Sequence, residues 1–251
     1  MCQGPAATIN DAVLHSGTGS VLILLCTYNE VENLPEMVRE LHQEIPLADI
    51  LVVDDASPDG TGLWVAEAQK TDPKLFLYQR PGKLGLGTAT RDGMSWCLER
   101  GYDYLIQMDS DFSHRPTDAP RLLQVCHQSE CDIAVGTRYS GGGGHQMSLH
   151  RSLMSRCLNR YCNWLLKLPV SDCSGSFRCY RVAQLRKIYL NGLVCTGYGF
   201  LEELLVHLHR SGARMVEVPI QFDQRAFGRS KLGLGDALGV LRIVHTLARS
   251  R

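Results

Sequence analysis

Two aspartates separated by one residue are the positions in this chain whose type and spacing best fit a chemical role. Asp109 and Asp111 follow the apolar segment 104–108. Side chains at positions i and i+2 of an extended chain point the same way, so the two carboxylates share a face. They would repel one another unless a cation lay between them. Mg²⁺ or Mn²⁺ prefers oxygen ligands and often joins carboxylates to substrate phosphates. The pair predicts a metal-assisted nucleotide-sugar site, with two solvated carboxylates at a strand end as the alternative.

The composition is that of a globular protein and excludes several functional classes. Of 251 residues, 44% are hydrophobic and 21% are charged, which argues against wholesale disorder. Lys+Arg and Asp+Glu number 26 each, so no overall field attracts nucleic acid, and a polyanion site must be a local cluster. The ten cysteines show neither a CxxC pair nor zinc-ligand spacing, which favours a reducing, cytoplasmic location. Residues 1–19 lack the features of a secretory signal and are predicted to form a flexible tail. No apolar run approaches the roughly 20 residues that span a bilayer.

The elements that must position the aspartates alternate regularly in the first half. Strands are predicted at 21–26, 49–54, 75–78 and 104–108, with helices from Leu34 to Leu41, from Leu63 to Lys70 and from about Thr88 to Arg100. This β-α-β-α order predicts a single α/β domain with a mostly parallel, doubly wound sheet. Ligands of such sheets bind beyond the carboxyl ends of the strands. The polar clusters 27–30, 54–59 and 109–114 all fall at these ends.

The second half is less regular. We predict a strand at 133–138, a glycine run at 141–144 too flexible for an element interior, helices at 150–167 and 199–210, a short strand at 176–180 and a final strand at 215–222. Pro219 places that last strand at a sheet edge. The segment 234–248 predicts an amphipathic C-terminal helix with Arg242 and Arg249 on another face. Such a helix either lies on an anionic membrane or packs on the body with its basic face solvated.

Each polar cluster of the first half has a binding and a structural interpretation. Thr27, Tyr28 and Glu30 offer a hydroxyl, a ring and a carboxylate to a nucleoside, or Asn29 caps a helix that begins there. One carboxylate of the pair 54–55 can reach a base or ribose, while the other caps the next helix. Lys83 lies among glycines and could meet a phosphate, although a plain loop is the better interpretation on local grounds.

The second half supplies cations. Arginine binds phosphate through a planar fork and lysine through a compact charge. The set Arg138, Arg151, Arg156 and Arg160, followed later by Arg225, Arg229 and Lys231, therefore suits a phosphate-rich donor together with an anionic acceptor, although each arginine taken alone is more simply a solvated surface residue.

The ordered motifs resemble a known family. Thr27-Tyr-Asn-Glu30, Val52-Val-Asp-Asp-Ala-Ser-Pro-Asp-Gly-Thr61, Lys83-Leu-Gly-Leu-Gly-Thr88 and Met108-Asp-Ser-Asp-Phe-Ser-His114 are similar to those of family 2 glycosyltransferases with the GT-A (Rossmann-like) fold. Asp172-Cys-Ser-Gly-Ser-Phe-Arg178 and the stretch from Val218 to Lys231 resemble the dolichol-phosphate (polyprenol-phosphate) mannosyltransferases. The resemblance covers about 21–234, nearly the whole chain.

The resemblance implies the following functional sites. A nucleoside of GDP-mannose would contact Thr27, Tyr28, Glu30, Val53 and Asp55, and the rest of the nucleotide sugar would contact Lys83, Ser110, Arg225 and Lys231. A divalent cation, Mg²⁺ or Mn²⁺, would bind Asp109 and Asp111, with Ser113 as a candidate third ligand. Many relatives have a glutamine at that third position, and they commonly have a proline where this chain has Cys26. The phosphate of a polyprenyl (dolichyl) acceptor would contact Arg138, Arg151, Ser155 and Lys231.

From this resemblance we expect mannose transfer from GDP-mannose to a polyprenyl phosphate with inversion, in which the metal and Arg225 neutralise the GDP leaving group. The nucleotide half would span about 20–115, the acceptor half about 116–233 and the C-terminal helix about 234–249, within one domain at 20–251. The enzyme would be peripheral on the cytoplasmic face of a membrane, held there by its lipid substrate, its last helix or a small membrane partner. The alternatives are another donor such as UDP-glucose and a catalytically silent binding subunit. A dinucleotide-dependent dehydrogenase is disfavoured because no G-x-G-x-x-G follows the first strand.

Overall fold

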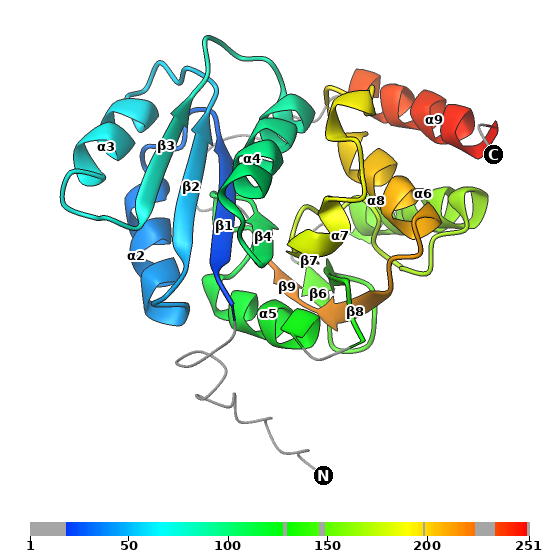
Figure 1. Ribbon diagram of the computed structural model, residues 1–251. Helices are drawn as coiled ribbons and strands as arrows, with labels where there is room; N and C mark the ends of the chain where they lie inside the picture. Colours follow the sequence, from blue (N-terminus) through cyan, green and yellow to red (C-terminus); the bar gives the residue numbers. More distant parts are fainter. Residues whose placement is uncertain (1–18, 128–129, 146–148, 198, 224–233, 250–251) are drawn as a thin grey trace.

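The computed structural model describes residues 19–127, 130–145, 149–197, 199–223 and 234–249, and its centre is a seven-stranded sheet (Figure 1). In sheet order the strands are β3 (Leu75–Gln79), β2 (Asp49–Asp54), β1 (Val21–Thr27), β4 (Tyr104–Met108), β7 (Arg178–Arg181), β5 (Ile133–Thr137) and β8 (Met215–Pro219). Strand β7 is antiparallel to both of its neighbours, whereas the other pairs are parallel. The mostly parallel, doubly wound α/β sheet predicted from the alternation of elements is therefore confirmed.

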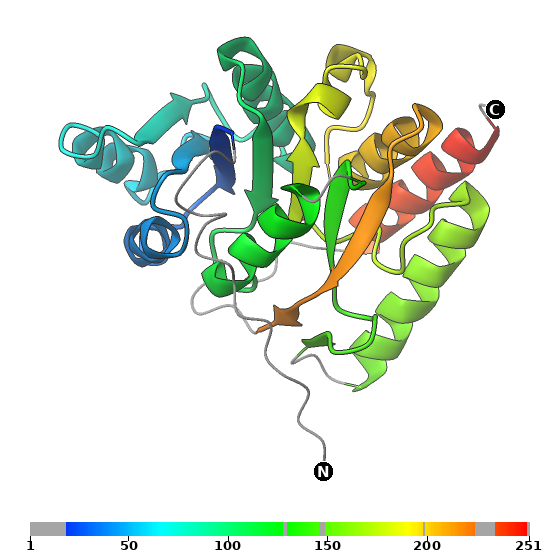
Figure 2. The same cartoon turned by 60° about the horizontal axis from the view of Figure 1, so that its bottom comes forward.

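Helices cover both faces of this sheet (Figures 1 and 2). One face packs on α2 (Leu34–Glu44), α3 (Thr61–Ala68) and α5 (Ala119–His127). The other packs on α4 (Leu86–Arg100), α6 (Leu149–Leu166), α8 (Phe200–Arg210) and α9 (Leu234–Arg249). Short helices complete the chain: η1 (Pro116–Asp118), α7 (Val182–Leu185) and η2 (Leu190–Gly192). Strand β1 contributes side chains to the hydrophobic cores on both faces of the sheet, because alternate side chains of a strand point to opposite faces. Leu22 lies in one core and Ile23 in the other.

Most predicted elements lie within two residues of the observed ones, and the differences have structural causes. The predicted strand at 215–222 is divided into β8 and β9 (Gln221–Phe222), and β9 pairs with β6 (Gly144–His145) in a separate ribbon. The glycine run thus contributes to a short strand, contrary to our expectation. Pro219 ends β8, which is the edge strand that a residue without an N–H requires. Helix α5 was not predicted from the sequence.

The C-terminal helix packs on the body. Val244 and Leu247 of α9 are buried, and α9 contacts α6 and α8, beside which it lies in both views (Figures 1 and 2). Arg210 Nη2 donates to the Leu247 carbonyl at 2.6 Å. The described side chains of this helix therefore favour packing over a membrane-lying face. Within the part of the chain that the structure describes, no helix is long and apolar enough to cross a bilayer.

Candidate active site

Three loops leave the carboxyl ends of the adjacent strands β2, β1 and β4 at one edge of the sheet. Each loop contains a non-glycine residue with positive φ: Asn29 at 59°, Ala56 at 53° and Phe112 at 61°. This left-handed conformation is costly for residues with a side chain, above all for a bulky one. Backbone strain of this kind clusters at functional sites, because the surrounding structure must hold it in place. The edge predicted to bind the donor is thus also where the backbone is most constrained.

The loops after β1 and β2 are hydrogen-bonded to one another. The Asn29 amide donates to Ser57 Oγ and the Glu30 amide donates to Thr61 Oγ1, each at 3.0 Å. Helix α2 begins only at Leu34, so Asn29 is a loop residue in the left-handed region and does not cap that helix, contrary to the structural alternative above. The loop is shaped by its neighbour, which leaves Glu30 partly exposed at the strand ends.

Two residues predicted to contact the donor, Tyr28 and Lys83, lie together. Lys83 Nζ is 4.1 Å from the centroid of the Tyr28 ring, within the range of a cation–π contact. Their separation of 55 positions in sequence is closed because both follow strand ends at this edge. An aromatic face and an exposed positive charge therefore lie at one place, which suits a base or sugar next to a phosphate.

The paired aspartates at the end of β2 have different structural roles. Asp54 is fully buried and accepts hydrogen bonds from Thr27 Oγ1 at 3.0 Å, the Ser57 amide at 3.0 Å and Gln79 Nε2 at 2.7 Å. It therefore holds the turn after β2. The Thr27 hydroxyl is directed to this carboxylate, and Val53 is fully buried in the core. A contact of Val53 with a nucleoside stays a prediction, and the buried side chain leaves only the backbone of this residue to make it.

Asp55 is held by an arginine that the sequence did not single out. Arg80 Nη1 contacts Asp55 Oδ1 at 2.5 Å, while the amides of Leu84 and Gly85 donate to Oδ2, both at 3.1 Å. Arg80 is itself buried and also meets Asp92 at 3.1 Å. Asp55 thus fixes the loop that carries Lys83. The only sequence signal for Arg80 is its place after β3, in line with the other strand-end polar residues.

The aspartates that end β4 are unequally exposed. The Asp109 side chain is 33% exposed, whereas Asp111 is buried and accepts the Ser113 amide at 3.0 Å. Ser176, from the loop before β7, donates its hydroxyl to Asp109 Oδ1 at 2.8 Å. Ser113 Oγ is buried and has no hydrogen-bond partner among the described residues. One carboxylate is therefore available at the surface, and an oxygen of unmet hydrogen-bonding capacity lies in the same loop.

His114 lies beside Asp109 as a neutral ring. Its Nδ1 is 3.8 Å from Asp109 Oδ2 but accepts the Asp109 amide at 3.2 Å, which requires an unprotonated Nδ1. Burial lowers the pKa of His114, although the nearby carboxylates oppose this. The ring packs on Phe177 and Phe222 at centroid distances of 5.0 and 5.4 Å. His114 therefore supports the loop and does not form an ion pair.

These oxygens fit a magnesium- or manganese-type ion. Among the described residues, no three His, Cys, Asp or Glu side chains gather into a metal-binding group. A cation at Asp109 and Asp111 would complete its shell with water, substrate phosphate and the unpartnered Ser113 hydroxyl, which is the usual manner in which Mg²⁺ binds with substrate phosphates. The donor set is all oxygen, as hard cations require.

Arg138, predicted to contact the acceptor phosphate, is one half of a buried ion pair. Its Nε and Nη2 donate to the two carboxylate oxygens of Asp172 at 2.7 and 2.8 Å, and Nη2 also donates to Ser174 Oγ at 3.0 Å. Burial alone would raise the pKa of Asp172, yet the charge and hydrogen bonds of Arg138 hold it below its ordinary value. Among the described residues, Arg138 Nη1 has no hydrogen-bond partner. The pairing was not predicted, although Asp172 belongs to a motif that the sequence singled out.

The other predicted acceptor residues are placed in part. Ser155 in α6 exchanges a hydrogen bond of 2.7 Å with the Tyr139 hydroxyl, next to Arg138. Arg151 begins the same helix, but its side chain, like Arg225 and Lys231 as a whole, is outside the described residues. The chain that leads to Arg225 is anchored beside the aspartates, because the Asp223 amide donates to the Ser113 carbonyl at 3.0 Å.

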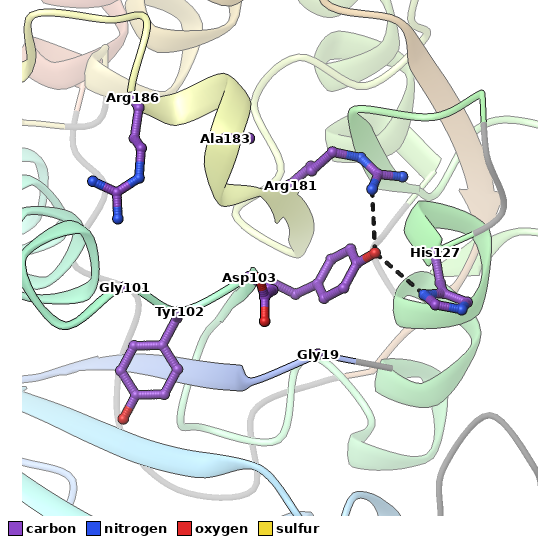
Figure 3. A pocket seen from close by; sticks show the side chains of 9 residues that line it. Gly19, Gly101, Tyr102, Asp103, His127, Arg181, Ala183 and Arg186 are labelled. Atoms are coloured by element: carbon purple, nitrogen blue, oxygen red, sulfur yellow. Dashed lines mark hydrogen bonds between the residues drawn. The ribbon is translucent and has the colours of Figure 1, made fainter. Parts of the chain in front are cut away.

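A hollow lies at the opposite edge of the sheet, and the side chains that line it have a structural role. It measures about 410 Å³ and is lined by residues at the amino ends of β1 and β4 (Figure 3). Arg181 donates there to the Tyr104 hydroxyl at 3.3 Å and to the Cys126 carbonyl at 2.8 Å. The Arg181 guanidinium thus links β4 and β7 to α5, which is a structural role. The edge at the carboxyl ends of β2, β1 and β4 is therefore the better candidate for the active site.

The fold and its oxygen- and cation-bearing edge define a nucleotide-sugar-type α/β protein, and comparisons with known proteins specify it. The model of glycosyl transferase family 2 matches residues 22–189, and the chain belongs to this family. It is 41% identical over 216 residues to an undecaprenyl-phosphate mannosyltransferase of Micrococcus luteus, covering 86% of this chain and 88% of that one. It is 40% identical over 217 residues to a polyprenol monophosphomannose synthase of Mycolicibacterium smegmatis, covering 86% and 82%.

Solved structures confirm the GT-A-like fold. A glucosyl-3-phosphoglycerate synthase of Mycobacterium tuberculosis, in complex with Mn²⁺, UDP-glucose and phosphoglyceric acid, superposes with a TM-score of 0.70 over 98% of this chain and 85% of that chain. A mannosyltransferase of Pyrobaculum calidifontis with GDP-mannose and Mn²⁺ gives 0.57 over 84% and 58%. Both are 16% identical to this chain, so the likeness concerns the fold.

Proposed function

We propose that this chain transfers mannose from GDP-mannose to a polyprenyl phosphate, with inversion and with a divalent cation at Asp109 and Asp111. The names of the two relatives of 40–41% identity support the sugar and the acceptor class. The structural observation that carries the proposal is the closeness of donor and acceptor residues. Ser176 binds Asp109, and Asp172 binds Arg138. Because Asp172 and Ser176 are four positions apart in the chain, their Cα atoms are at most about 14 Å apart.

On the donor side, the protein orients a diphosphate at the strand ends. Tyr28 and Lys83 offer a ring and a charge, and Asp55 fixes the loop of Lys83 through the amides of Leu84 and Gly85. Asp109 presents its partly exposed carboxylate to the same edge. A bound Mg²⁺ or Mn²⁺ supplies charge neutralisation for the leaving diphosphate. Arg225 remains the predicted second source of positive charge there.

On the acceptor side, the protein needs to position a nucleophile that is already ionised. A phosphate monoester has a second pKa near 6, so it is largely dianionic at neutral pH and requires no strong base. Asp172 fixes the plane of the Arg138 guanidinium and leaves Nη1 for the phosphate. Asp172 neutralises the charge of Arg138. The dianionic phosphate is therefore expected to be stabilised further by Ser155, Arg151 and Lys231, the other residues predicted to contact it.

We infer that the surface that would meet the lipid lies on α6. Leu153, Met154 and Trp164 are 62, 60 and 73% exposed, and exposed Arg156 and Arg160 precede Trp164 by about two turns and one turn on the same side of the helix. The sequence of α6 contains no acidic residue. An apolar stripe edged with arginine suits the interface of an anionic membrane. We infer a peripheral position on the cytoplasmic face of a membrane, with α6 toward the lipid.

Transfer of radiolabelled sugar into a lipid-extractable product tests the proposal. GDP-mannose, GDP-glucose and UDP-glucose are each offered with polyprenyl phosphate, with Mn²⁺ and with a chelator. We expect product from GDP-mannose alone and only with the cation. Product from UDP-glucose would replace the donor assignment, and donor binding without product from any sugar would favour a silent binding subunit.

A further inference from the structure

The loop between α6 and β7 contacts both halves of the candidate active site. This linking loop, residues 171–177, supplies Ser176 to Asp109 and Asp172 to Arg138. Its position follows from the topology, because β7 is antiparallel to the strands on either side of it. The amino end of β7 therefore lies at the edge where β4 and β5 end. The loop that enters β7 must pass between the residue after β4, Asp109, and the residue after β5, Arg138.

Buried side chains fix the backbone of the linking loop. Asn159 of α6 accepts the amides of Cys173 and Ser174 through Oδ1 at 3.0 and 3.3 Å. Arg178 Nη2 donates to the Cys173 carbonyl at 2.6 Å, and Asp172 accepts the amide of Gly175 at 3.2 Å. Asn159, Arg178 and Asp172 are each at most 3% exposed. Because the backbone is hydrogen-bonded at several points, the loop holds its serine side chains in fixed positions.

The contact at the donor end orients a carboxylate that is otherwise loosely held. Asp109 is one-third exposed, and among the described residues the Ser176 hydroxyl is the hydrogen-bond donor to its carboxylate. The bond engages Oδ1 and so restricts the rotation of the carboxylate, while Oδ2 lies 3.8 Å from His114 Nδ1. Hydrogen bonds to metal-binding carboxylates orient them, and their loss typically costs about 10- to 100-fold in metal affinity.

The contact at the acceptor end uses another serine of the same loop. Ser174 Oγ accepts from Arg138 Nη2 at 3.0 Å and from Asn159 Nδ2 at 3.1 Å. It lies two positions before Ser176, yet the two hydroxyls serve different sites. The loop thus contains one serine for the carboxylate of the donor site and one for the guanidinium of the acceptor site.

We propose that the linking loop is a positioning element in which Ser176 orients Asp109 for the metal and Ser174 orients Arg138 for the acceptor phosphate. This rests on the proposed function, because it presupposes that Asp109 binds metal and that Arg138 binds phosphate. The two serines then control separate steps of one reaction, while Asn159, which accepts the amides of Cys173 and Ser174 and donates to Ser174 Oγ, supports the loop on which both depend.

The test compares single variants by two readouts. Mn²⁺ affinity is measured by electron paramagnetic resonance with GDP present, and the KM for polyprenyl phosphate is measured at saturating metal and donor. Ser176→Ala should weaken Mn²⁺ binding about 10-fold or more, and Ser176→Thr, which keeps the hydroxyl, should restore it. Ser174→Ala should leave Mn²⁺ binding unchanged and raise the acceptor KM several-fold. Ser211→Ala, in a distant turn, is the control for loss of a serine hydroxyl.

Asp109→Ala and Arg138→Ala distinguish failure of this inference from failure of the proposed function. Unchanged Mn²⁺ binding in Asp109→Ala would contradict the proposed metal site. An unchanged acceptor KM in Arg138→Ala would contradict the proposed acceptor site. If those variants lose binding while Ser176→Ala and Ser174→Ala behave as wild type, the sites stand and the positioning role is wrong. Equal effects of both serine variants on both readouts would also overturn the separate roles. Thermal melting of each variant reports whether the fold is retained.

Discussion

The half proposed to bind the donor, about 20–115, and the half proposed to bind the acceptor, about 116–233, are built in different ways. In the donor half, each functional cluster follows its own strand, so parallel strands place Tyr28, Asp55 and Asp109 at one edge. In the acceptor half, Arg138 acquires its place through a carboxylate 34 positions away and a loop held by three buried polar residues. In the first arrangement Asp109 is partly exposed at a strand end while Asp55 is buried against Arg80, and in the second Arg138 and Asp172 form a buried pair.

This difference implies that the two halves should respond differently to mutation. Removal of a partly exposed donor carboxylate costs charge at the site but little folding energy. Removal of one member of a buried pair leaves the other as an unpaired buried charge, which is strongly destabilising. Loss of activity without loss of stability is therefore expected for Asp109, and the coupled loss of both is expected for the buried pair of Arg138 and Asp172.

The largest effect is expected at the two carboxylates proposed to bind the metal. Asp109→Ala and Asp111→Ala should each reduce transfer by about 10³-fold, since a Lewis-acid contribution of several kcal/mol is lost. Mannosyl transfer by single-turnover assay measures the effect. For Asp109→Ala we also expect a thermal midpoint near that of wild type. Near-normal transfer by either folded variant would sink the metal assignment.

At the buried pair, the main effect should appear in stability. Asp172→Asn should lower the free energy of unfolding by about 3 kcal/mol, because the guanidinium of Arg138 stays buried without its counter-charge. Denaturant titration measures this. The double variant Arg138→Met/Asp172→Asn should regain part of the loss, since no unpaired charge is left. A double variant less stable than Asp172→Asn would show that the pair is not what holds this half together.

A second buried carboxylate of the acceptor half, Glu202, should lower the stability of the folded state when it ionises, whereas ionised Asp172 raises it. Burial raises the pKa of Glu202 in α8 to about 7, from an ordinary value of 4.5. Between these values only the folded state keeps the proton, so this group makes stability fall as pH rises from about 4.5 to 7 and leaves a constant deficit above pH 7. Glu202→Gln should remove the deficit, about 3 kcal/mol at pH 8, and should change little near pH 4.5.

Thermal melting of wild type and Glu202→Gln across pH 4.5–8 measures this difference. Glu67, exposed on α3, provides the control as Glu67→Gln, which should not alter the pH profile. A wild-type profile that runs parallel to that of Glu202→Gln would contradict the shifted titration.

The smallest effect is expected at the α6 surface. Trp164→Glu should reduce binding to vesicles that contain anionic lipid by about tenfold, because one large apolar contact is lost and a like charge is added. Flotation with such vesicles measures it. Leu63→Glu in α3 of the donor half, where the side chain is 79% exposed, is the matched control and should bind as wild type. Equal losses in both variants would mean that α6 is not the lipid-facing surface.

The extent to which the sequence predicted the structure also differs between the halves. Helix α2 and strands β1 to β4 follow from periodicity, because their apolar residues are contiguous in sequence and the polar clusters come directly after them. The ion pairs of Arg80 with Asp55 and of Arg138 with Asp172 were not predicted, since each joins residues more than 20 positions apart. The contacts of Arg225 and Lys231 stay predictions, because both lie outside the described residues.

By itself, the sequence determined the alternation of strands and helices, the positions of Asp109 and Asp111 at a strand end and the family resemblance. These depend on local patterns, which are legible in a linear chain. Only the tertiary structure decided that β7 enters antiparallel between β4 and β5, that Ser176 and Asp172 consequently meet Asp109 and Arg138, and that the described part of α9 packs on the body while α6 exposes Trp164. Such choices depend on which surfaces bury one another, and burial is a property of the assembled fold.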